Sequence, residues 1–345
     1  MSVDERRTPD AEPRSNPSAT VMRHAPFAPG SVSVRLYPHN ELAADAIVSE
    51  LCAQAGLALC GGFDGVMTSE HHGGFAGYMA QPLQMASFVL AEHEKGWAAA
   101  APLLLPLRAT ALVAEEVAWL EARHPGRVGL GVAAGALPLD FAVTGVNQAD
   151  TVDRFKSELP RLVAMLRGED LGQLEGDPAL LACRRNPVPV LSAAVSVAAA
   201  VRAARCGAGI LMEGMSPPSR LARVTQAFGG AEGKGAKVLI RRVWLGRLQR
   251  DLIAGQRTVY ESYATQARSF GEDQTIAADE PEELVARLVT TMREVGADAL
   301  NLRVHLPGMS PAQVREQIAR IGSSVVKPLK AALPLLWSAE RDVTT

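Results

Sequence analysis

Two adjacent histidines, His71 and His72, stand in residues 68–74 (TSEHHGG), where the side-chain types are best suited to chemistry. The segment follows directly on a predicted strand, and barrel enzymes carry their catalytic groups at the carboxyl ends of strands. Histidine has the ordinary pKa nearest neutral pH, so such a ring can donate, accept or move a proton. We therefore predict that one ring is an acid, base or hydrogen-bond donor at a catalytic mouth. The alternative is that both rings bond only to nearby backbone.

A metal site at the paired histidines is not expected. Adjacent residues on an extended chain point to opposite faces, so His71 and His72 cannot easily hold one ion. The sequence also has no His-x-His or His-Glu-x-x-His spacing, which would put two ligands on one side.

Ser196 is the candidate phosphate ligand. It follows a predicted strand over residues 188–194 and opens an Ala-rich helix over residues 197–205. A serine at a helix start caps the helix, and the free N–H groups there favour an anion. A simple cap without a ligand explains the pattern equally well. The glycine-rich residues 129–135 and 229–235 lack the spacing of a phosphate loop.

Charged side chains also fall within two late predicted strands, with Arg241 and Arg242 in one and Arg303 and His305 in the other. A charge on a buried strand is unfavourable unless it is paired or meets a ligand. Arg303 and His305 share a face because side chains alternate along a strand. We favour a structural role for Arg303 and leave the roles of His305, Arg241 and His72 open.

Eight apolar segments alternate with helical segments along the chain, and this alternation predicts an α/β fold with a parallel sheet. Eight strand–helix units fit a (β/α)8 TIM barrel, with insertions at residues 168–187 and 271–283. Apolar residues recur at helical spacing over residues 43–51, 113–120, 284–295 and 314–321. The predicted strands are residues 31–37, 63–68, 96–101, 127–133, 188–194, 208–213, 237–245 and 298–304.

A doubly wound open sheet is the alternative fold. It would show a glycine-rich turn after its first strand, but residues 38–41 read Pro-His-Asn-Glu. The barrel is therefore expected to form a single domain over residues 31–340. Residues 1–30 contain five prolines and one aromatic residue, and we expect them to be a disordered leader.

The composition excludes several classes of protein. Lysine and arginine number 35 against 37 aspartates and glutamates, and 5% of the residues are aromatic. A nucleic-acid binder would need a basic footprint or a stacking platform. No apolar run reaches the roughly 18 residues of a membrane span, and no secretory signal follows the N-terminal charges. The four cysteines form no Cys-x-x-Cys pair. We expect a cytoplasmic protein with reduced thiols and without nucleic-acid or membrane partners.

Three segments together resemble the luciferase-like monooxygenase family, which includes the bacterial luciferase α chain and many flavin-dependent oxidoreductases. The similarity covers about residues 31–333 and keeps the order of several motifs: Glu-His-His, then Leu-Pro and Glu-Glu-Val, then GR-V-x-L-G-x-x-x-G, then D-F-x-x-x-G. The segments are residues 63–77 (FDGVMTSEHHGGFAG), residues 101–145 (APLLLPLRATALVAEEV through DFAVTG) and residues 296–330 (GADALNLRVHLPGMSPAQVREQIARIGSSVVKPLK).

The resemblance implies a barrel that binds flavin at its carboxyl mouth. His71 matches the family's catalytic histidine beside the flavin ring, and Ser196 matches a serine that holds the flavin phosphate. The family's cis peptide bond beneath the ring falls at Ala101–Pro102. A cis bond before proline costs only about 0.5–1 kcal/mol, so we predict that this bond is cis.

One departure concerns the cofactor. Ala133, Ala134 and Gly135 stand where luciferase has Cys-Arg-Gly, whose arginine helps to hold phosphate. The leading interpretation is still a monooxygenase that uses reduced FMN (FMNH2) and oxygen to oxygenate a small organic substrate. The alternatives are a deazaflavin-dependent hydride-transfer oxidoreductase and a non-catalytic flavin-binding barrel subunit.

The partners follow from the same resemblance. No nicotinamide fingerprint is present, so a separate flavin reductase is expected to supply the reduced flavin. Family members commonly pair through their first helices, and the apolar helix over residues 112–120 favours a homodimer. The identity of the substrate is not predicted, because specificity lies in loops grafted on the fold.

Overall fold

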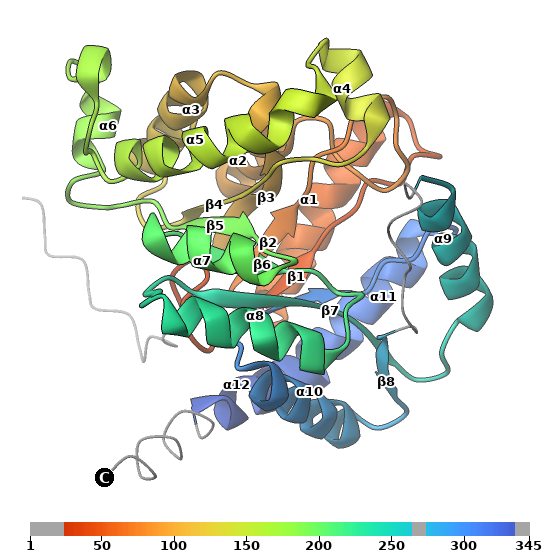
Figure 1. The fold of residues 1–345 in the computed structure, drawn as a ribbon. Helices are drawn as coiled ribbons and strands as arrows, with labels where there is room; N and C mark the ends of the chain where they lie inside the picture. The colour runs from red at the N-terminus through yellow and green to blue at the C-terminus, as the bar shows by residue number, and fades with distance from the viewer. Residues whose placement is uncertain (1–23, 264–273, 335–345) are drawn as a thin grey trace, which may run out of the picture.

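The computed structural model describes residues 24–263 and 274–334, and its strands form the predicted closed barrel (Figure 1). Neighbouring strands follow the order β1–β2–β3–β4–β5–β6–β7–β9, and β9 pairs back with β1, always in parallel. This closure confirms the TIM barrel and excludes the open sheet. The strands are β1 (Val32–Arg35), β2 (Gly65–Thr68), β3 (Trp97–Leu104), β4 (Val128–Ala133), β5 (Val190–Ala193), β6 (Gly209–Met212), β7 (Lys237–Leu245) and β9 (Ala299–Arg303).

Helices surround the barrel, and several begin with a proline at the first helical position, where its fixed φ suits the helix and no N–H is needed. The two predicted insertions hold short elements: α6 in one, and strand β8 (Ile276–Ala278), which pairs with the end of β7, in the other. The helices are α1 (Ala44–Cys60), α2 (Pro82–Glu92), α3 (Thr110–Arg123), α4 (Pro138–Thr144), α5 (Thr151–Met165), α6 (Pro178–Ala182), α7 (Val197–Arg205), α8 (Pro218–Gly230), α9 (Arg250–Tyr263), α10 (Pro281–Val295), α11 (Pro311–Ile321) and α12 (Lys327–Ala332).

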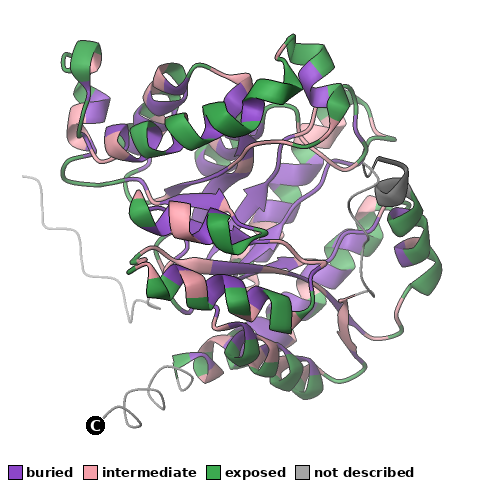
Figure 2. Cartoon of the chain, in the orientation of Figure 1, coloured by how far each residue is buried: buried purple, intermediate pink, exposed green. Residues whose placement is uncertain are grey.

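Side chains alternate between the inside of the barrel and the layer beneath the helices. Outward-facing strand residues such as Val32 and Val34 join the large core under the helices, whereas inward-facing residues such as Met67 and Trp97 form a small inner cluster. The strands are therefore buried on both sides, as Figure 2 shows in purple. Among the described residues, no helix is both long enough and apolar enough to cross a membrane.

The N-terminal segment packs against the barrel from His24 onward, whereas the disordered leader is predicted to extend to residue 30. Phe27 is 1% exposed, and its ring meets Trp97 edge to face at 5.2 Å. The N–H of Gly30 donates to the carbonyl of Asp298 at 2.8 Å. A Cβ at Gly129 would come within 2.6 Å of the Phe27 ring, so this glycine gives the ring its place inside the barrel. Residues 1–23 lie outside the described residues.

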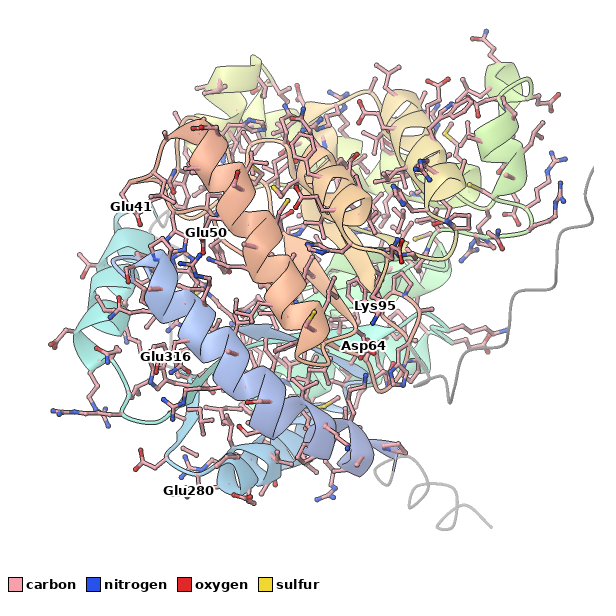
Figure 3. The ribbon with its side chains drawn as sticks, turned by 180° about the vertical axis from the view of Figure 1, so that it is seen from behind. Glu41, Glu50, Asp64, Lys95, Glu280 and Glu316 are labelled. Carbon is pink, nitrogen blue, oxygen red and sulfur yellow. The ribbon has the colours of Figure 1, made fainter. Side chains whose placement is uncertain are left out.

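Helices α1 and α11 lie side by side on the outside of the barrel, with Glu50 between them (Figure 3). Arg315 of α11 donates to Glu50 of α1 at 2.8 Å. Below them, Lys330 of α12 donates to Asp64 at 2.6 Å. Burial of Asp64 opposes ionisation, but hydrogen bonds from His24 and Lys330 hold the pKa of its carboxyl below the ordinary value. The last helix is thereby tied to the turn before β2.

Candidate active site

His71 lies just beyond the carboxyl end of β2 and is held by one buried carboxylate. Its Nδ1 is 2.8 Å from Oδ2 of Asp140, a residue of α4 whose side chain is fully buried. A carboxylate accepts hydrogen bonds, so Nδ1 carries the ring proton and Nε2 remains to act on a ligand. The side chain of His71 keeps 20% of its surface exposed. This arrangement fixes one tautomer and presents an acceptor nitrogen at the mouth of the barrel.

His72 turns to a different carboxylate. Its Nε2 is 2.9 Å from Oε1 of Glu70, while its backbone N–H donates to Oδ1 of Asp140 at 2.8 Å. The two adjacent rings therefore point to different partners, as expected on an extended chain. Within the described ranges, no group of three potential metal ligands is found.

Glu70 joins the ends of β2 and β3. It is 1% exposed, and its carboxylate accepts the N–H of Leu104 at 2.6 Å and a guanidinium N–H of Arg108 at 2.7 Å. Its own N–H donates to the carbonyl of Pro102 at 3.0 Å. Because the Glu70 carboxylate has these partners as well as His72, the His72 ring belongs to the scaffold that positions His71.

Aromatic rings wall one side of His71. The ring of Tyr78 lies at 4.5 Å and that of Phe75 at 5.1 Å from the imidazole, centroid to centroid. Tyr37, which follows β1, meets Tyr78 at 5.4 Å. The chain reaches this wall through Gly73, whose φ of 66° is a conformation that glycine adopts readily. These rings cover His71 on the side of β1.

Small residues stand toward the carboxyl ends of β3 and β4, the strands that follow β2 around the barrel. Ala101 is fully buried, and the Ala101–Pro102 bond is cis, as predicted, where the pairing of β3 with β4 shifts register. Residues 133–135 follow at the end of β4 and are partly exposed. A Cβ at Gly135 would lie 3.1 Å from the ring of Phe141, the neighbour of Asp140. Gly135 is thus brought close to α4, the helix that holds His71.

Ser196 caps α7, as predicted. Its Oγ accepts the N–H of Ala199 at 3.3 Å, and its side chain is exposed. Arg220, near the start of α8, donates to the carbonyl of Val195 at 3.4 Å. A guanidinium therefore stands beside the cap, where an anion could also receive backbone N–H groups of the first helical turn.

The late-strand side chains divide between the two faces of the barrel wall. Arg241 faces outward, is 1% exposed and donates to the carbonyls of Gly214 and Ser216 at 2.9 and 3.2 Å. Burial lowers the pKa of its guanidinium. Arg303 faces inward, with Cζ 4.5 Å from the centre of the Tyr37 ring. The structural role favoured for Arg303 thus includes a cation–π contact.

His305 is packed in a buried stack. Its ring lies 4.5 Å from that of His39 at an interplanar angle of 21°. Burial lowers the pKa of His305 to about 3, and the nearby His39 and Arg303 act in the same direction. At neutral pH this ring is therefore uncharged.

The sequence model of the luciferase-like monooxygenases matches residues 32–327. The chain belongs to the luciferase-like monooxygenase family. Its fold is similar to that of monooxygenase RslO1 from Streptomyces bottropensis, with 18% identity, a TM-score of 0.69, and coverage of 86% of this chain and 99% of that chain.

Two further luciferase-like folds differ in the cofactor that their descriptions name. One is the oxygenating constituent of 3,6-diketocamphane monooxygenase from Pseudomonas putida in complex with FMN (14% identity, TM-score 0.67, covering 87% of this chain and 98% of that chain). The other is an F420-dependent secondary alcohol dehydrogenase in complex with an F420–acetone adduct. It has 17% identity and a TM-score of 0.66, and the match covers 86% of this chain and 98% of that chain. Among curated sequences, the uncharacterized protein y4wF of Sinorhizobium fredii is 26% identical over 216 residues, which span 61% of this chain and 62% of that protein.

Sequence reasoning missed two residues of this luciferase-like site. Asp140 stands in the D-F-x-x-x-G motif, but nothing in that motif indicates a bond to a histidine 69 positions earlier. Arg220 gave no signal, because it lies in an ordinary helix and only the fold brings it to the carbonyl of Val195, the residue before Ser196. The signal that could have indicated Asp140 is its position: it is an acidic residue that follows β4 at the same end of the barrel as His71.

Proposed function

We propose that this protein is a monooxygenase that uses reduced FMN and molecular oxygen to oxygenate a small organic substrate. The observation that carries the proposal is the His71–Asp140 pair, with Nδ1 bonded to a buried carboxylate and Nε2 at the mouth of a luciferase-like barrel. A flavin-binding barrel without chemistry would have no need of a histidine oriented in this way.

The residues at the mouth fit a flavin. A flat ring system needs a surface without bulky side chains. Ala101 of β3 faces the inside of the barrel, and by alternation along the strands so do Ala133 and Ala193, the last residues of β4 and β5. A phosphate needs cations and N–H donors, and Ser196, the first turn of α7 and Arg220 offer them. The hydrophobic ring and the charged tail would thus meet matching surfaces on adjoining strands.

Bound reduced flavin supplies the electrons that activate oxygen, and the protein supplies orientation, protons and a dry site. His71 donates or accepts a proton at Nε2. Asp140 keeps the imidazole in the tautomer that leaves Nε2 available. Phe75 and Tyr78, at 5.1 and 4.5 Å from the imidazole, exclude water from its flank.

A deazaflavin-dependent oxidoreductase that transfers hydride is the second candidate. Two observations favour it: Ala134 stands where luciferase has a phosphate-binding arginine, and the fold is also similar to that of an F420-dependent alcohol dehydrogenase. In that case product would form without uptake of oxygen.

We further propose two protein partners. One is a separate flavin reductase, the source of reduced FMN. The other is a second copy of the chain, because α3 exposes Leu112 (59%) and Trp119 (54%) and the adjacent α2 exposes Phe88 (37%). Sedimentation of the wild-type protein should give a dimer and that of Trp119→Lys a monomer; a wild-type monomer would contradict the dimer.

An anaerobic titration with reduced FMN and with reduced deazaflavin tests the cofactor. We expect saturable binding of reduced FMN, weakened about 10- to 100-fold in Arg220→Gln because a charge-assisted hydrogen bond is lost. Arg287→Gln is the matched control, since this exposed arginine of α10 also donates to a backbone carbonyl, that of Ala277. Binding of deazaflavin alone would favour the second candidate, and binding of neither would refute the flavin proposal.

A further inference from the structure

A small cavity of about 90 Å³ lies one aromatic ring away from the candidate catalytic histidine. Tyr78 lines this cavity, and its ring lies 4.5 Å from that of His71. Two other lining residues are Tyr37, which follows β1, and Arg303, which ends β9, so the cavity lies at the carboxyl mouth of the barrel. Its volume is enough for several water molecules or for a small polar group of a larger molecule.

His305 lines the cavity with a side chain that is packed on several sides. The residue is 6% exposed, its ring stacks on that of His39 at 4.5 Å, and it meets the ring of Tyr37 edge to face at 5.8 Å. The imidazole also forms a hydrogen bond with the backbone of Tyr37. Nδ1 is buried and has no hydrogen-bond partner among the described residues. A buried polar atom without a partner is unfavourable, so a ligand that supplies one is favoured at this position.

The surroundings of His305 determine what Nδ1 can accept. A backbone carbonyl can only accept a hydrogen bond, so the bond to Tyr37 uses a ring N–H, and because Nδ1 is unpartnered this N–H belongs to Nε2. Burial, together with the nearby His39 and Arg303, lowers the pKa of His305 to about 3, so the ring is neutral near pH 7. In a neutral ring with its proton on Nε2, Nδ1 carries a lone pair and requires a hydrogen-bond donor.

The charges around the cavity favour a neutral ligand. The lining residues that the structure describes include one guanidinium, that of Arg303, and one carboxylate, that of Glu41, which bonds to the ring of His39 at 3.2 Å. Neither sign of charge is in excess. An anion would face the lone pair of Nδ1 and a cation would face Arg303, whereas a neutral donor meets neither repulsion.

Asn40 favours a hydroxyl group over other neutral donors. It lines the exposed rim of the cavity, and its amide oxygen accepts the N–H of Gly77 at 2.7 Å. The group of Asn40 that can still bond to a ligand is therefore its NH2, which is a donor. An amide N–H of a ligand could donate to His305 but could not accept from Asn40. A hydroxyl group does both, so it suits a cavity that offers one acceptor and one donor.

We infer that this cavity binds a neutral hydroxyl group of the substrate, which donates a hydrogen bond to Nδ1 of His305 while the reacting part of the molecule extends past Tyr78 toward His71. That the ligand is the substrate rests on the proposed function, whereas the binding of a hydroxyl group requires neither flavin nor turnover. His305 then determines specificity, because a molecule of the same shape without the hydroxyl would leave Nδ1 buried and unpaired.

The test compares ethanol with acetonitrile in the protein without flavin. The two molecules are similar in size and both accept hydrogen bonds, but only the hydroxyl of ethanol donates one well. NMR of the protein labelled in its histidine rings follows each titration. We expect ethanol to bind about 10-fold more tightly than acetonitrile, with nuclear Overhauser effects from its methyl protons to the ring of His305. The signals of His71 should move over the same ethanol concentrations, because Tyr78 both lines the cavity and contacts His71.

Three variants assign the preference to His305, with binding read from the signals of His71. His305→Phe keeps a flat ring but has no acceptor, so the preference for ethanol should fall to about twofold or less. His305→Asn offers a side-chain oxygen near the place of Nδ1 and should keep part of the preference. His124→Phe is the matched control, because it makes the same change at another buried histidine, which follows α3 and lies outside the cavity. It should leave the preference within about twofold of the wild-type value.

Three results would overturn the inference. One is that ethanol binds no better than acetonitrile to the wild-type protein, as expected of a cavity that holds only water. Another is that His305→Phe keeps the full preference. The third is that ethanol moves the signals of His305 but not those of His71, which would separate the cavity from the catalytic ring. Each of these results would leave the flavin proposal standing, because the anaerobic titration tests flavin binding independently.

Discussion

Replacement of Asp140 by asparagine tests the orientation of His71, because it changes the hydrogen-bonding atoms while keeping the size and shape of the side chain. The carboxylate accepts two hydrogen bonds of 2.8 Å, from Nδ1 of His71 and from the N–H of His72. The amide of Asn keeps one oxygen for the His72 N–H and turns its NH2 toward Nδ1. Two donors would then face each other, so the imidazole must move its proton to Nε2.

The magnitude follows from the bond that is lost. A charge-assisted hydrogen bond is worth about 1.5–3 kcal/mol, so the tautomer with the proton on Nδ1 should fall about 10- to 100-fold relative to the other. Nitrogen NMR of ring-labelled histidine reports the tautomer directly. We expect Nδ1–H in the wild-type protein, Nε2–H in Asp140→Asn, and an oxygenation rate lowered by the same factor.

Glu70→Gln is the matched control. It makes the same change from a carboxylate to an amide of equal size, at the residue before His71, but this carboxylate bonds to the ring of His72. It should alter the His72 signals and leave the His71 tautomer as it is. The reasoning is refuted if Asp140→Asn keeps the Nδ1–H tautomer, or if it changes the tautomer without any effect on the rate.

Three further predictions concern stability and reactivity. Glu70→Ala leaves the partly buried guanidinium of Arg108 and the buried N–H of Leu104 without their carboxylate, and should lower the free energy of unfolding by about 3 kcal/mol, as urea titration will report. A thiol reagent at pH 8 should label the exposed Cys60 first and spare Cys52 and Cys183, since burial raises the pKa of these two thiols to about 12 and 11; early labelling of Cys52 would contradict this. His305 has a pKa of about 3 in the folded protein and about 6.5 when unfolded, so the unfolded chain takes up the proton first and stability is lost as pH falls below 6.5. His305→Asn should therefore remove about 2–3 kcal/mol of the loss between pH 7 and pH 4.5, and an unchanged loss would show that another group is responsible.

The barrel strands were predictable because their signal is local. Each predicted strand is a short apolar segment that lies between segments with helical spacing of apolar residues. A strand that is buried on both faces must be apolar along most of its length, so its sequence is easily recognised. Strand β8 and helix α4 were not predicted, since three and seven residues carry too little periodicity. The packing of residues 24–30 was also missed. The prolines of this segment indicate disorder, but the ring of Phe27 packs edge to face against that of Trp97 and holds the segment in place.

The site was predictable only where one side chain carries the signal. His71 and Ser196 each stand directly after a strand, so their place at the mouth follows from the barrel alone. Asp140 reaches His71 across 69 residues, a contact that depends on how α4 is turned. Arg303 of β9 pairs with Arg35 of β1 and with Arg242 of β7, and these strand registers cannot be predicted from the sequence of any one strand.

The most direct test of the proposed function is rapid mixing of the protein, loaded anaerobically with reduced FMN, with oxygenated buffer while the flavin absorbance is followed. We predict that the bound flavin reacts with oxygen, and that His71→Asn changes the rate of this reaction at least about tenfold while binding reduced FMN normally. A bound flavin that does not react with oxygen, or a reaction that is the same in His71→Asn, would contradict the account.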